Sequence, residues 1–215
     1  MNDYLFTSGN VMSAPSGAIG GGRQVWLELS QADKLPGGYS LDLSNLPVGT
    51  VLQAGTPIKV NETTRVCTPH LSFSVYENAA LGATALKVNK NLGASVAYVG
   101  MFIMAAPSTL AGTGTGIEVT AIDRSNAEYD VFTVAALAAA VTAGAVYVEC
   151  DKAGAGAVIK NVPSALTVAD TAKLASTDKF SCTPAVGGQI YERRIPPCID
   201  AFKAVVPNVI FLKSK

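Results

Sequence analysis

The stretch GIEVTAIDRSNAEYDVFTVAA, residues 116–136, decides the fold class of this 215-residue chain. Apolar and polar residues alternate on both sides of Asp123-Arg124-Ser125-Asn126, a run of residue types that is typical of a turn. Alternation with a period of two indicates a half-buried β-strand, and two such runs around a short polar turn predict a β-hairpin.

Further strand-like runs lie on both sides of this hairpin, separated by Gly, Asn, Asp and Pro. Short strands at near-regular spacing are typical of a β-sandwich or barrel rather than of βαβ units, so we expect an all-β fold. One run, 98–106, is apolar almost throughout, which predicts a strand buried on both faces. The predicted strands outside the hairpin are 56–66, 71–76, 84–91, 98–106, 145–151 and 209–212.

Helix is expected in few places. The segment ALAAA (136–140) has the propensity for one or two turns before Gly144, and TVADTAKLAS (167–176) is a second candidate with Asp170 as its cap. The tail 191–215 contains three prolines, which argue against helix there.

Two Gly-Thr steps mark the segment LPVGTVLQAGTPIKV (46–60), at Gly49 and at Gly55. Glycine permits positive φ and close backbone approach, whereas Thr and the flanking Val, Leu and Ile prefer extended backbone. The pattern therefore predicts two sharp turns between short strands, with Pro57 at the start of the next strand. It does not predict a phosphate-binding loop, because the Lys-Ser or Lys-Thr pair and the following helix are missing.

The first 45 residues differ in composition from the rest. They are rich in glycine and contain one strand-like piece, QVWLELS (24–30). We expect residues 1–45 to form an extended N-terminal arm that docks on a partner or on its own domain. Residues 46–215 then form the main β domain, with a small inserted β-subdomain at about 76–152.

The strand-like piece of the arm carries the candidate partner-binding residues. Val25, Leu27 and Leu29 share one predicted face. They alternate with Trp26, Glu28 and Ser30, so Trp26 lies on the opposite face. A lone tryptophan at such a place is either an anchor in a protein interface or a cap on the core, and both alternatives stay open.

The charges exclude two classes of partner. The 16 basic and 16 acidic residues cancel, and no basic cluster exceeds Arg193-Arg194, so we expect no nucleic-acid binding. No apolar run reaches the length of a membrane span, and the N-terminus lacks a secretory signal pattern. Charged residues make up only 15% of the chain, against about 25% in typical soluble domains. A surface so poor in charge favours burial against protein partners.

The cysteines and the single histidine suggest little chemistry. Cys67 lies three residues before His70, so a catalytic Cys–His pair is one alternative. A zinc site that adds Cys150 and either Cys182 or Cys198 is another. Because no CxxC pair is present, we expect free thiols in a reducing compartment, with no metal and no cofactor.

The acidic residues around the hairpin are the remaining catalytic candidates. Glycoside hydrolysis needs a pair of carboxylates, which Glu118, Asp123, Glu128 and Asp130 could supply, but a solvated turn explains them more simply. Sugar sites are also rich in exposed aromatic residues, and only 7% of this chain is aromatic. We therefore expect a protein that is not an enzyme.

Several segments resemble the capsid decoration and head fibre proteins of tailed bacteriophages, and the resemblance covers residues 45–215. They are LPVGT with AGTPI (46–58), ALGATALKVNKN (80–91), GIEVTAIDRSNAEYDVFTV (116–134), VTAGAVYVECD (141–151) and the tail segments VGGQIYERRIPP (186–197) and PNVIFL (207–212).

This resemblance implies a virion structural protein that is made in the bacterial host cytoplasm and binds the outer capsid surface. Its partners would be the major capsid protein and copies of itself, as a homotrimer. The arm, 1–45, would be the capsid-docking or oligomer-swapping element. The alternative is a non-enzymatic sugar- or receptor-binding β-module of a phage tail or cell surface.

Overall fold

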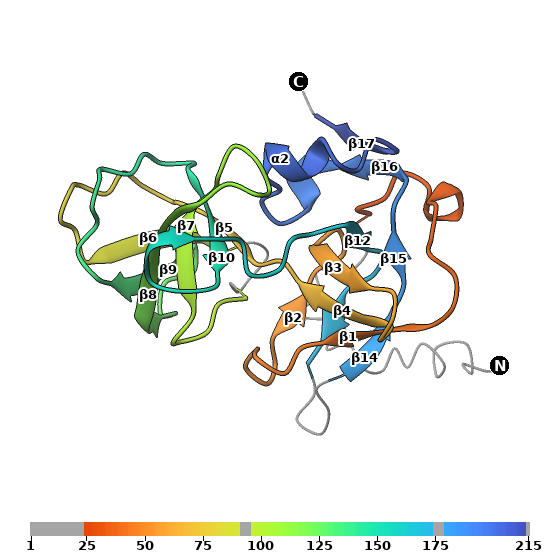
Figure 1. The fold of residues 1–215 in the computed structure, drawn as a ribbon, viewed down its shortest axis with the longest axis horizontal. Helices are drawn as coiled ribbons and strands as arrows, with labels where there is room; N and C mark the ends of the chain where they lie inside the picture. The colour runs from red at the N-terminus through yellow and green to blue at the C-terminus, as the bar shows by residue number, and fades with distance from the viewer. Residues whose placement is uncertain (1–23, 91–95, 174–178, 214–215) are drawn as a thin grey trace.

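A computed structural model of the chain describes residues 24–90, 96–173 and 179–213. Nearly all of its regular structure is β, which confirms the predicted fold class. Two barrel-like sheets lie side by side, and a small sheet with a short helix lies above them (Figure 1).

The first barrel is a six-stranded sheet whose two ends nearly meet. Its order is β14 (Lys179–Cys182), β1 (Tyr39–Asp42), β4 (Val66–Pro69), β3 (Pro57–Asn61), β12 (Ala165–Thr167) and β15 (Pro184–Ala185). Only Thr183 separates β14 from β15, so one extended stretch pairs first with β1 and then with β12. Strands β1 and β4 are parallel and the other neighbours antiparallel. A two-stranded sheet, β2 (Val51–Leu52) with β13 (Thr171–Ala172), completes this half.

The second barrel lies between β4 and β12 in the sequence. Its antiparallel order is β5 (Ser72–Ser74), β10 (Val146–Cys150), β7 (Phe102–Ala105), β8 (Gly114–Asp123), β9 (Tyr129–Val134) and β6 (Ala85–Asn89). An isolated bridge from Val75 to Val88 joins the end of β5 back to β6 and nearly closes this sheet. Strand β11 (Gly154–Ala157) pairs with β8 outside the ring.

The clearest sequence predictions are confirmed. Residues 116–136 form the antiparallel hairpin β8–β9, with Ile122 opposite Phe132. Both Gly-Thr steps are turns, since φ is +86° at Gly49 and +78° at Gly55. A side chain at Gly55 is also excluded by space, because an added Cβ would lie 2.2 Å from Cγ2 of Ile195.

The predicted strand 24–30 is wrong. Trp26 forms only an isolated bridge with Ile190, and a 3-10 turn, η1 (Leu29–Gln31), follows directly. The predicted alternation of faces is also wrong, because Val25 and Trp26 are both buried while Leu27 and Leu29 are exposed. The physical reason is that so short a pairing does not impose strand geometry beyond Leu27, and the turn then redirects the chain.

The helix predictions are also corrected. Residues 136–140 form no helix, because this loop pairs instead with residues 79–83 through backbone hydrogen bonds. Asp170 caps no helix among the described residues; its Oδ1 accepts a hydrogen bond from the backbone N–H of Ala54. The tail does contain a helix, α2 (Asp200–Lys203), as well as the 3-10 turn η3 (Glu192–Arg194). The prolines permit α2 because they lie outside it on both sides.

The two barrels share their hydrophobic cores. One buried cluster runs from Leu41 and Ile58 in the first barrel to Phe132 in the second. The other brings Met104 and Val148, from the second barrel, together with Leu166, Ile190 and Phe202. Phe202, from α2, is fully buried within this second cluster.

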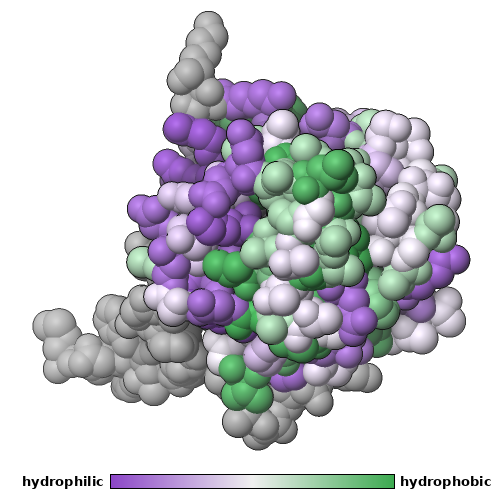
Figure 2. All heavy atoms as spheres, turned by 90° about the vertical axis from the view of Figure 1, so that its left-hand side faces the viewer, coloured by the Kyte–Doolittle hydropathy of each residue, from purple (hydrophilic) through white to green (hydrophobic). Residues whose placement is uncertain are grey.

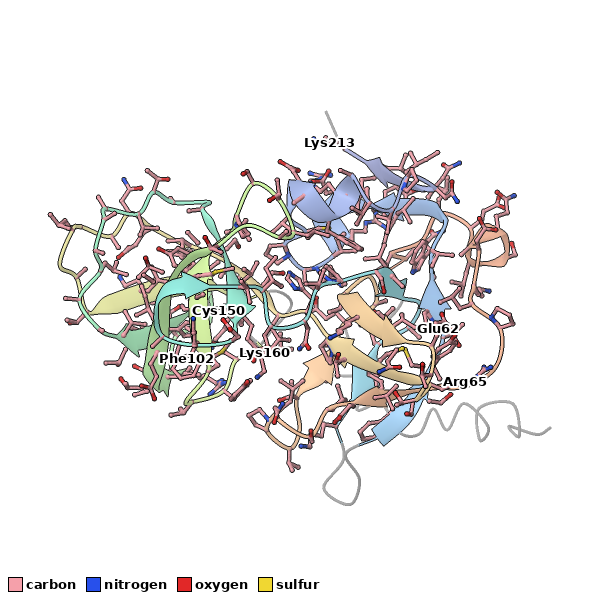
Figure 3. The ribbon with its side chains drawn as sticks, viewed as in Figure 1. Glu62, Arg65, Phe102, Cys150, Lys160 and Lys213 are labelled. Atoms are coloured by element: carbon pink, nitrogen blue, oxygen red, sulfur yellow. The ribbon has the colours of Figure 1, made fainter. Side chains whose placement is uncertain are left out.

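Polar contacts complete the junction between the barrels. Glu149 Oε1 accepts hydrogen bonds from the hydroxyl of Tyr98 and from Nζ of Lys160, the latter at 2.7 Å. Figure 3 places Lys160 on the side of the second barrel that faces the first. Burial and the hydrogen bond to Glu149 raise the pKa of Tyr98, so its hydroxyl remains protonated as the donor. This cluster fixes polar groups where the barrels meet.

His70 is buried next to this junction. Its Nδ1 donates a hydrogen bond to the carbonyl oxygen of Asn161 at 2.9 Å, and Nδ2 of Asn161 donates to the carbonyl of Pro69. Burial lowers the pKa of His70 to about 4, which the contact with Asn161 only partly offsets.

This burial predicts a pH-dependent stability. The folded state binds the His70 proton less tightly than the unfolded chain does, so stability present above pH 6.5 is lost as the pH falls towards 4. We expect the free energy of unfolding to fall by roughly 2–3 kcal/mol between pH 7.5 and 4.5 through this group alone. Urea titrations of the wild type and of His70→Gln measure it, because the wild-type loss should exceed the variant's loss by that amount. Equal losses in the two proteins would contradict the assignment.

Candidate functional site: an interaction surface

The C-terminal sheet is built from segments far apart in the sequence. Strands β16 (Gly188–Tyr191) and β17 (Val209–Leu212) pair in parallel, joined by the crossover 192–208 that contains α2. Residues 25–27 join the other edge of β16, where Leu27 N–H donates to Gln189 and Tyr191 N–H donates to Val25. Strand β16 is thus central, and the far edge of β17 pairs with no strand in the described part of the chain.

The inner face of this sheet belongs to the core. Trp26, Ile190 and Val209 are buried there together with Phe202. Gly188 makes this packing possible, because an added Cβ would lie 3.1 Å from Cα of Ala32 and 3.3 Å from Cζ3 of Trp26. Its φ of +122° also disfavours any other residue.

The outer face of this sheet is apolar and uncovered by any described residue. Leu27 is 36% exposed and Ile210 54% exposed, and Leu212 lies one strand repeat beyond Ile210. We call the row Leu27, Ile210 and Leu212 the outer face. Large exposed apolar side chains that line a hollow are typical of protein-interaction sites.

Two hollows lie along the outer face. The first holds about 150 Å³ and is lined by Leu27 and Ile210 together with backbone and polar groups. The polar side chains around it are Glu28, Gln31, Gln189 and Asn208.

The second hollow, of about 260 Å³, lies at the other end of the two strands and is cationic. Its lining consists of Tyr191, Leu212 and three basic residues, Arg193, Arg194 and Lys213. Figure 3 shows Lys213 just beyond the end of β17. We call this hollow the cationic hollow.

The basic residues of the cationic hollow differ in their contacts. Arg194 is held in place, since its guanidinium lies 4.5 Å from the centre of the Tyr191 ring and its Nη1 donates to the carbonyl oxygen of Gln24. Arg193 and Lys213 make no ion pair with any residue that the structure describes. Neither residue has a direct ion-pair partner among them, although the charge of Lys213 contributes to lowering the pKa of Asp200.

The crossover beneath the sheet is held by an ion-pair network. Nζ of Lys203 lies 2.6 Å from Oε1 of Glu192 and 2.8 Å from Oδ1 of Asp200. Burial opposes the charge on Lys203, but the bonds to Asp200 and Glu192 outweigh it and raise its pKa. Lys203 thus joins Glu192, at the start of the crossover, to Asp200 in its helix.

The predicted partner-binding residues divide between the two faces. Val25 and Trp26 lie in the core, so of the two alternatives for Trp26 the structure supports the cap on the core. Leu27 belongs to the outer face. Leu29 is 46% exposed on η1. Sequence reasoning missed Ile210 and the cationic hollow. The run VIFL predicted strand β17, but nothing in it indicated an open edge beside β16.

A second apolar surface lies on the second barrel. Figure 2 looks onto the end of this barrel and shows a band of apolar side chains beside a hydrophilic region. A hollow of about 370 Å³ on this barrel is lined by Ala138, Ala139 and Ala140 and by inward residues such as Ile117 and Tyr147. None of its lining residues is charged.

The catalytic and metal alternatives find no support in the geometry. His70 bonds to Asn161, whereas the thiol of Cys67 contacts that of Cys182 inside the first barrel. All four cysteines are unpaired, and in the described residues no group of three His, Cys, Asp or Glu side chains could hold a metal ion.

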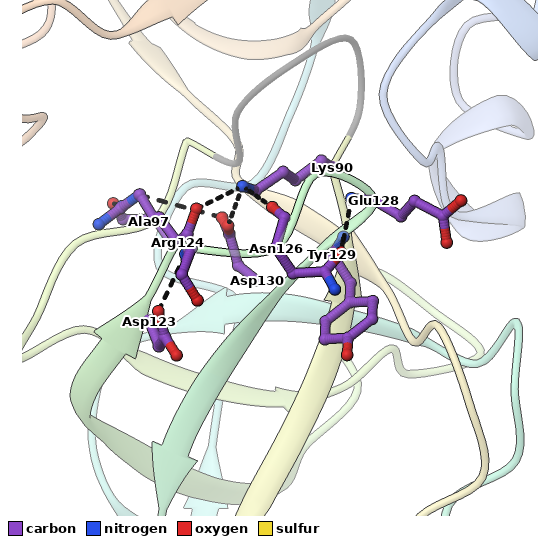
Figure 4. A network of polar contacts seen from close by, with 9 residues as sticks. Lys90, Ala97, Asp123, Arg124, Asn126, Glu128, Tyr129 and Asp130 are labelled. Atoms are coloured by element: carbon purple, nitrogen blue, oxygen red, sulfur yellow. Dashed lines mark hydrogen bonds and ion pairs between the residues drawn. The ribbon is translucent and has the colours of Figure 1, made fainter.

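The hairpin carboxylates do not form a solvated catalytic pair. Asp130 is fully buried, with Oδ1 at 3.2 Å from Nζ of Lys90 and Oδ2 at 3.9 Å from Nε of Arg124 (Figure 4). Asp123 accepts a hydrogen bond from the backbone of its own turn, and Glu128 accepts one from Tyr76. The expectation of a solvated turn is therefore wrong for Asp130, which is a structural ion-pair partner of Lys90.

Comparisons with protein-family models, with curated proteins and with solved structures found no match. In the portion of the chain that the structure describes, none of the helices could cross a lipid bilayer.

The close packing at Gly188 gives a direct test of how the sheet is held. We expect Gly188→Ala to lower the free energy of unfolding by about 2–3 kcal/mol. The loss has two causes, the backbone strain of a non-glycine residue at this φ and the overly close contact of the new methyl group with Trp26. The matched control is Gly144→Ala, where φ is +82° but an added Cβ meets nothing within 4 Å. Denaturant titration should show a clearly larger loss for Gly188→Ala, and equal losses would contradict the packing role.

The buried ion pair at Asp130 gives another prediction. Asp130→Ala leaves Lys90 buried without its carboxylate partner, so we expect a loss of about 3–5 kcal/mol in the free energy of unfolding. Glu118→Ala, on the exposed side of β8, should change it by no more than about 0.5 kcal/mol. A thermal or urea melt that shows similar stability for both variants would rule out the structural role of Asp130.

Proposed function

We propose that this chain is a structural protein of a tailed-phage virion that binds the outer capsid surface as a homo-oligomer. The observation that carries the proposal is the outer face of the C-terminal sheet, whose inner face is fixed in the core while Leu27 and Ile210 remain exposed. Such a rigid apolar surface with polar and charged rims fits protein recognition better than small-molecule chemistry.

The charge of the whole chain supports the same function. Equal numbers of acidic and basic residues and few charged residues overall favour packing against other proteins. The uncharged hollow beside Ala138 and Tyr147 on the second barrel offers a separate surface for contact with copies of the same chain. The resemblance of residues 45–215 to capsid decoration and head fibre proteins supplies the identity of the partner.

The test is co-sedimentation of the purified chain with heads assembled from the major capsid protein encoded beside it. We expect saturable binding with a copy number that matches one class of lattice sites. Ile210→Glu should weaken binding by at least about tenfold, because it places a charge in the centre of the apolar contact.

The matched control is Val99→Glu, which changes an equally exposed apolar residue on the second barrel and should leave head binding unchanged. Absence of binding at any salt concentration would contradict the proposal. It would favour the alternative of a sugar- or receptor-binding module, for which glycan screening is the next experiment.

A further inference from the structure

One end of the second barrel carries a protruding turn beside the uncharged hollow. Leu81, at the tip of this turn, is 69% exposed, more than any other large apolar residue that the structure describes. The backbone N–H of Gly82 donates to the carbonyl oxygen of Leu137 at 2.9 Å, and Ala79 forms a bridge with Val141. The turn therefore lies directly against residues 137–141, which line the hollow.

The two segments that meet here carry no charge. Residues 78–84 and 135–145 contain no Asp, Glu, Lys or Arg, and most of them are alanine. The acidic residue closest in sequence, Glu77, is paired with Lys87 at 2.7 Å. Two copies of such a surface can meet without burying a charge or bringing like charges together.

Tyr147 is the only polar side chain among the buried residues that line the hollow. It is 6% exposed. Burial alone raises the pKa of Tyr147, with no contribution from a neighbouring charge or hydrogen bond. Its hydroxyl thus has no hydrogen-bond partner among the described residues, and a largely buried donor without a partner is costly. A group that fills the hollow should therefore bring a hydrogen-bond acceptor with it.

The turn at Leu81 offers both an apolar side chain and an acceptor. Its backbone is closed by the N–H of Ala83, which donates to the carbonyl oxygen of Ala80. The carbonyl oxygen of Leu81 accepts no hydrogen bond in the described part of the chain. A hollow of about 370 Å³ with apolar walls has room for the leucine side chain, and Tyr147 supplies a donor for the carbonyl.

The turn and the hollow are neighbours on one face of the barrel, as the backbone bonds between them require. When each of two copies gives its turn and receives that of the other, the contact has two-fold symmetry and closes after two chains. A head-to-tail ring or filament needs the two parts on separate faces instead.

We propose that two copies of the chain pair through this end of the second barrel. The Leu81 side chain of each copy enters the hollow of the other, and the Tyr147 hydroxyl there donates to the Leu81 carbonyl oxygen. This pairing specifies the self-contact of the proposed homo-oligomer, and it rests on that part of the proposed function. It makes a two-fold pair, rather than the homotrimer that the resemblance implies, the unit of assembly. The outer face of the C-terminal sheet takes no part in it.

Sedimentation velocity of the full-length chain without heads tests the pairing. We expect a monomer–dimer equilibrium whose dissociation constant rises at least about tenfold in Leu81→Asp and about fivefold in Tyr147→Phe. The matched control is Val99→Asp, which changes an exposed apolar residue of the same barrel outside the hollow and should leave the constant unchanged. Circular dichroism shows that each variant is folded.

Disulfide cross-linking tests the reciprocal geometry. Under mild oxidation, a mixture of the Leu81→Cys protein with the Ala139→Cys protein should give a covalent dimer, because Ala139 lines the hollow. The yield should exceed that of either variant alone and that of Val99→Cys mixed with Ala139→Cys.

Three results would overturn the inference. The first is a wild type that stays monomeric, or forms a trimer without a dimer, at concentrations up to about 1 mM. The second is an equal dissociation constant in the wild type and in Leu81→Asp. The third is a Leu81→Cys and Ala139→Cys mixture that cross-links no better than its controls. Because none of these measurements contains heads, a failed pairing is distinguished from a failed capsid contact, which shows only in co-sedimentation.

Discussion

The packing of the Trp26 indole so close to Gly188 that an added Cβ would lie 3.3 Å from its Cζ3 holds the C-terminal sheet in place. Trp26 is 4% exposed, and its Nε1–H finds no hydrogen-bond partner among the described residues. An unpaired buried donor costs about 1–3 kcal/mol, so the burial of the large ring must outweigh that cost. The same contact fixes residues 25–27 against β16 and thereby decides which side chains face outwards.

The crossover 192–208 connects the C-terminal sheet to the rest of the molecule. Its helix contributes Phe202 to the second buried cluster, and the carbonyl of Pro197 accepts a hydrogen bond from the hydroxyl of Ser72 in the second barrel. Lys203 ties the start and the helix of the crossover together through Glu192 and Asp200. The outer face is consequently part of a rigid unit, which lowers the entropic cost of binding there.

Local patterns were enough to predict the all-β fold, the hairpin 116–136 and the turns at Gly49 and Gly55. These features depend on alternation and on glycine φ angles, both of which are properties of neighbouring residues. The division into an arm, 1–45, and a main domain is less simple, because β1 (Tyr39–Asp42) pairs inside the first barrel with β4 and β14. Residues 1–23 lie outside the described residues, so most of the predicted arm stays a prediction.

The features that sequence reasoning missed all depend on contacts between distant segments. The parallel pairing of β16 with β17 spans a crossover, and the cationic hollow exists only because that pairing brings Arg193 beside Lys213. Asp130 was expected in a solvated turn, but it forms a buried ion pair with Lys90, which directly follows β6. Val25 and Trp26 share one side because a brief bridge, rather than a full strand, anchors them.

The fluorescence of Trp26 tests the central claim most directly, since it is the only tryptophan in the chain. The measurement is the emission maximum of the native protein together with its quenching by iodide and by acrylamide. The account predicts a blue-shifted emission and quenching far weaker than that of free tryptophan, both lost on unfolding. Emission and quenching like those of free tryptophan in the native protein would show that residues 25–27 are not docked and would contradict the account.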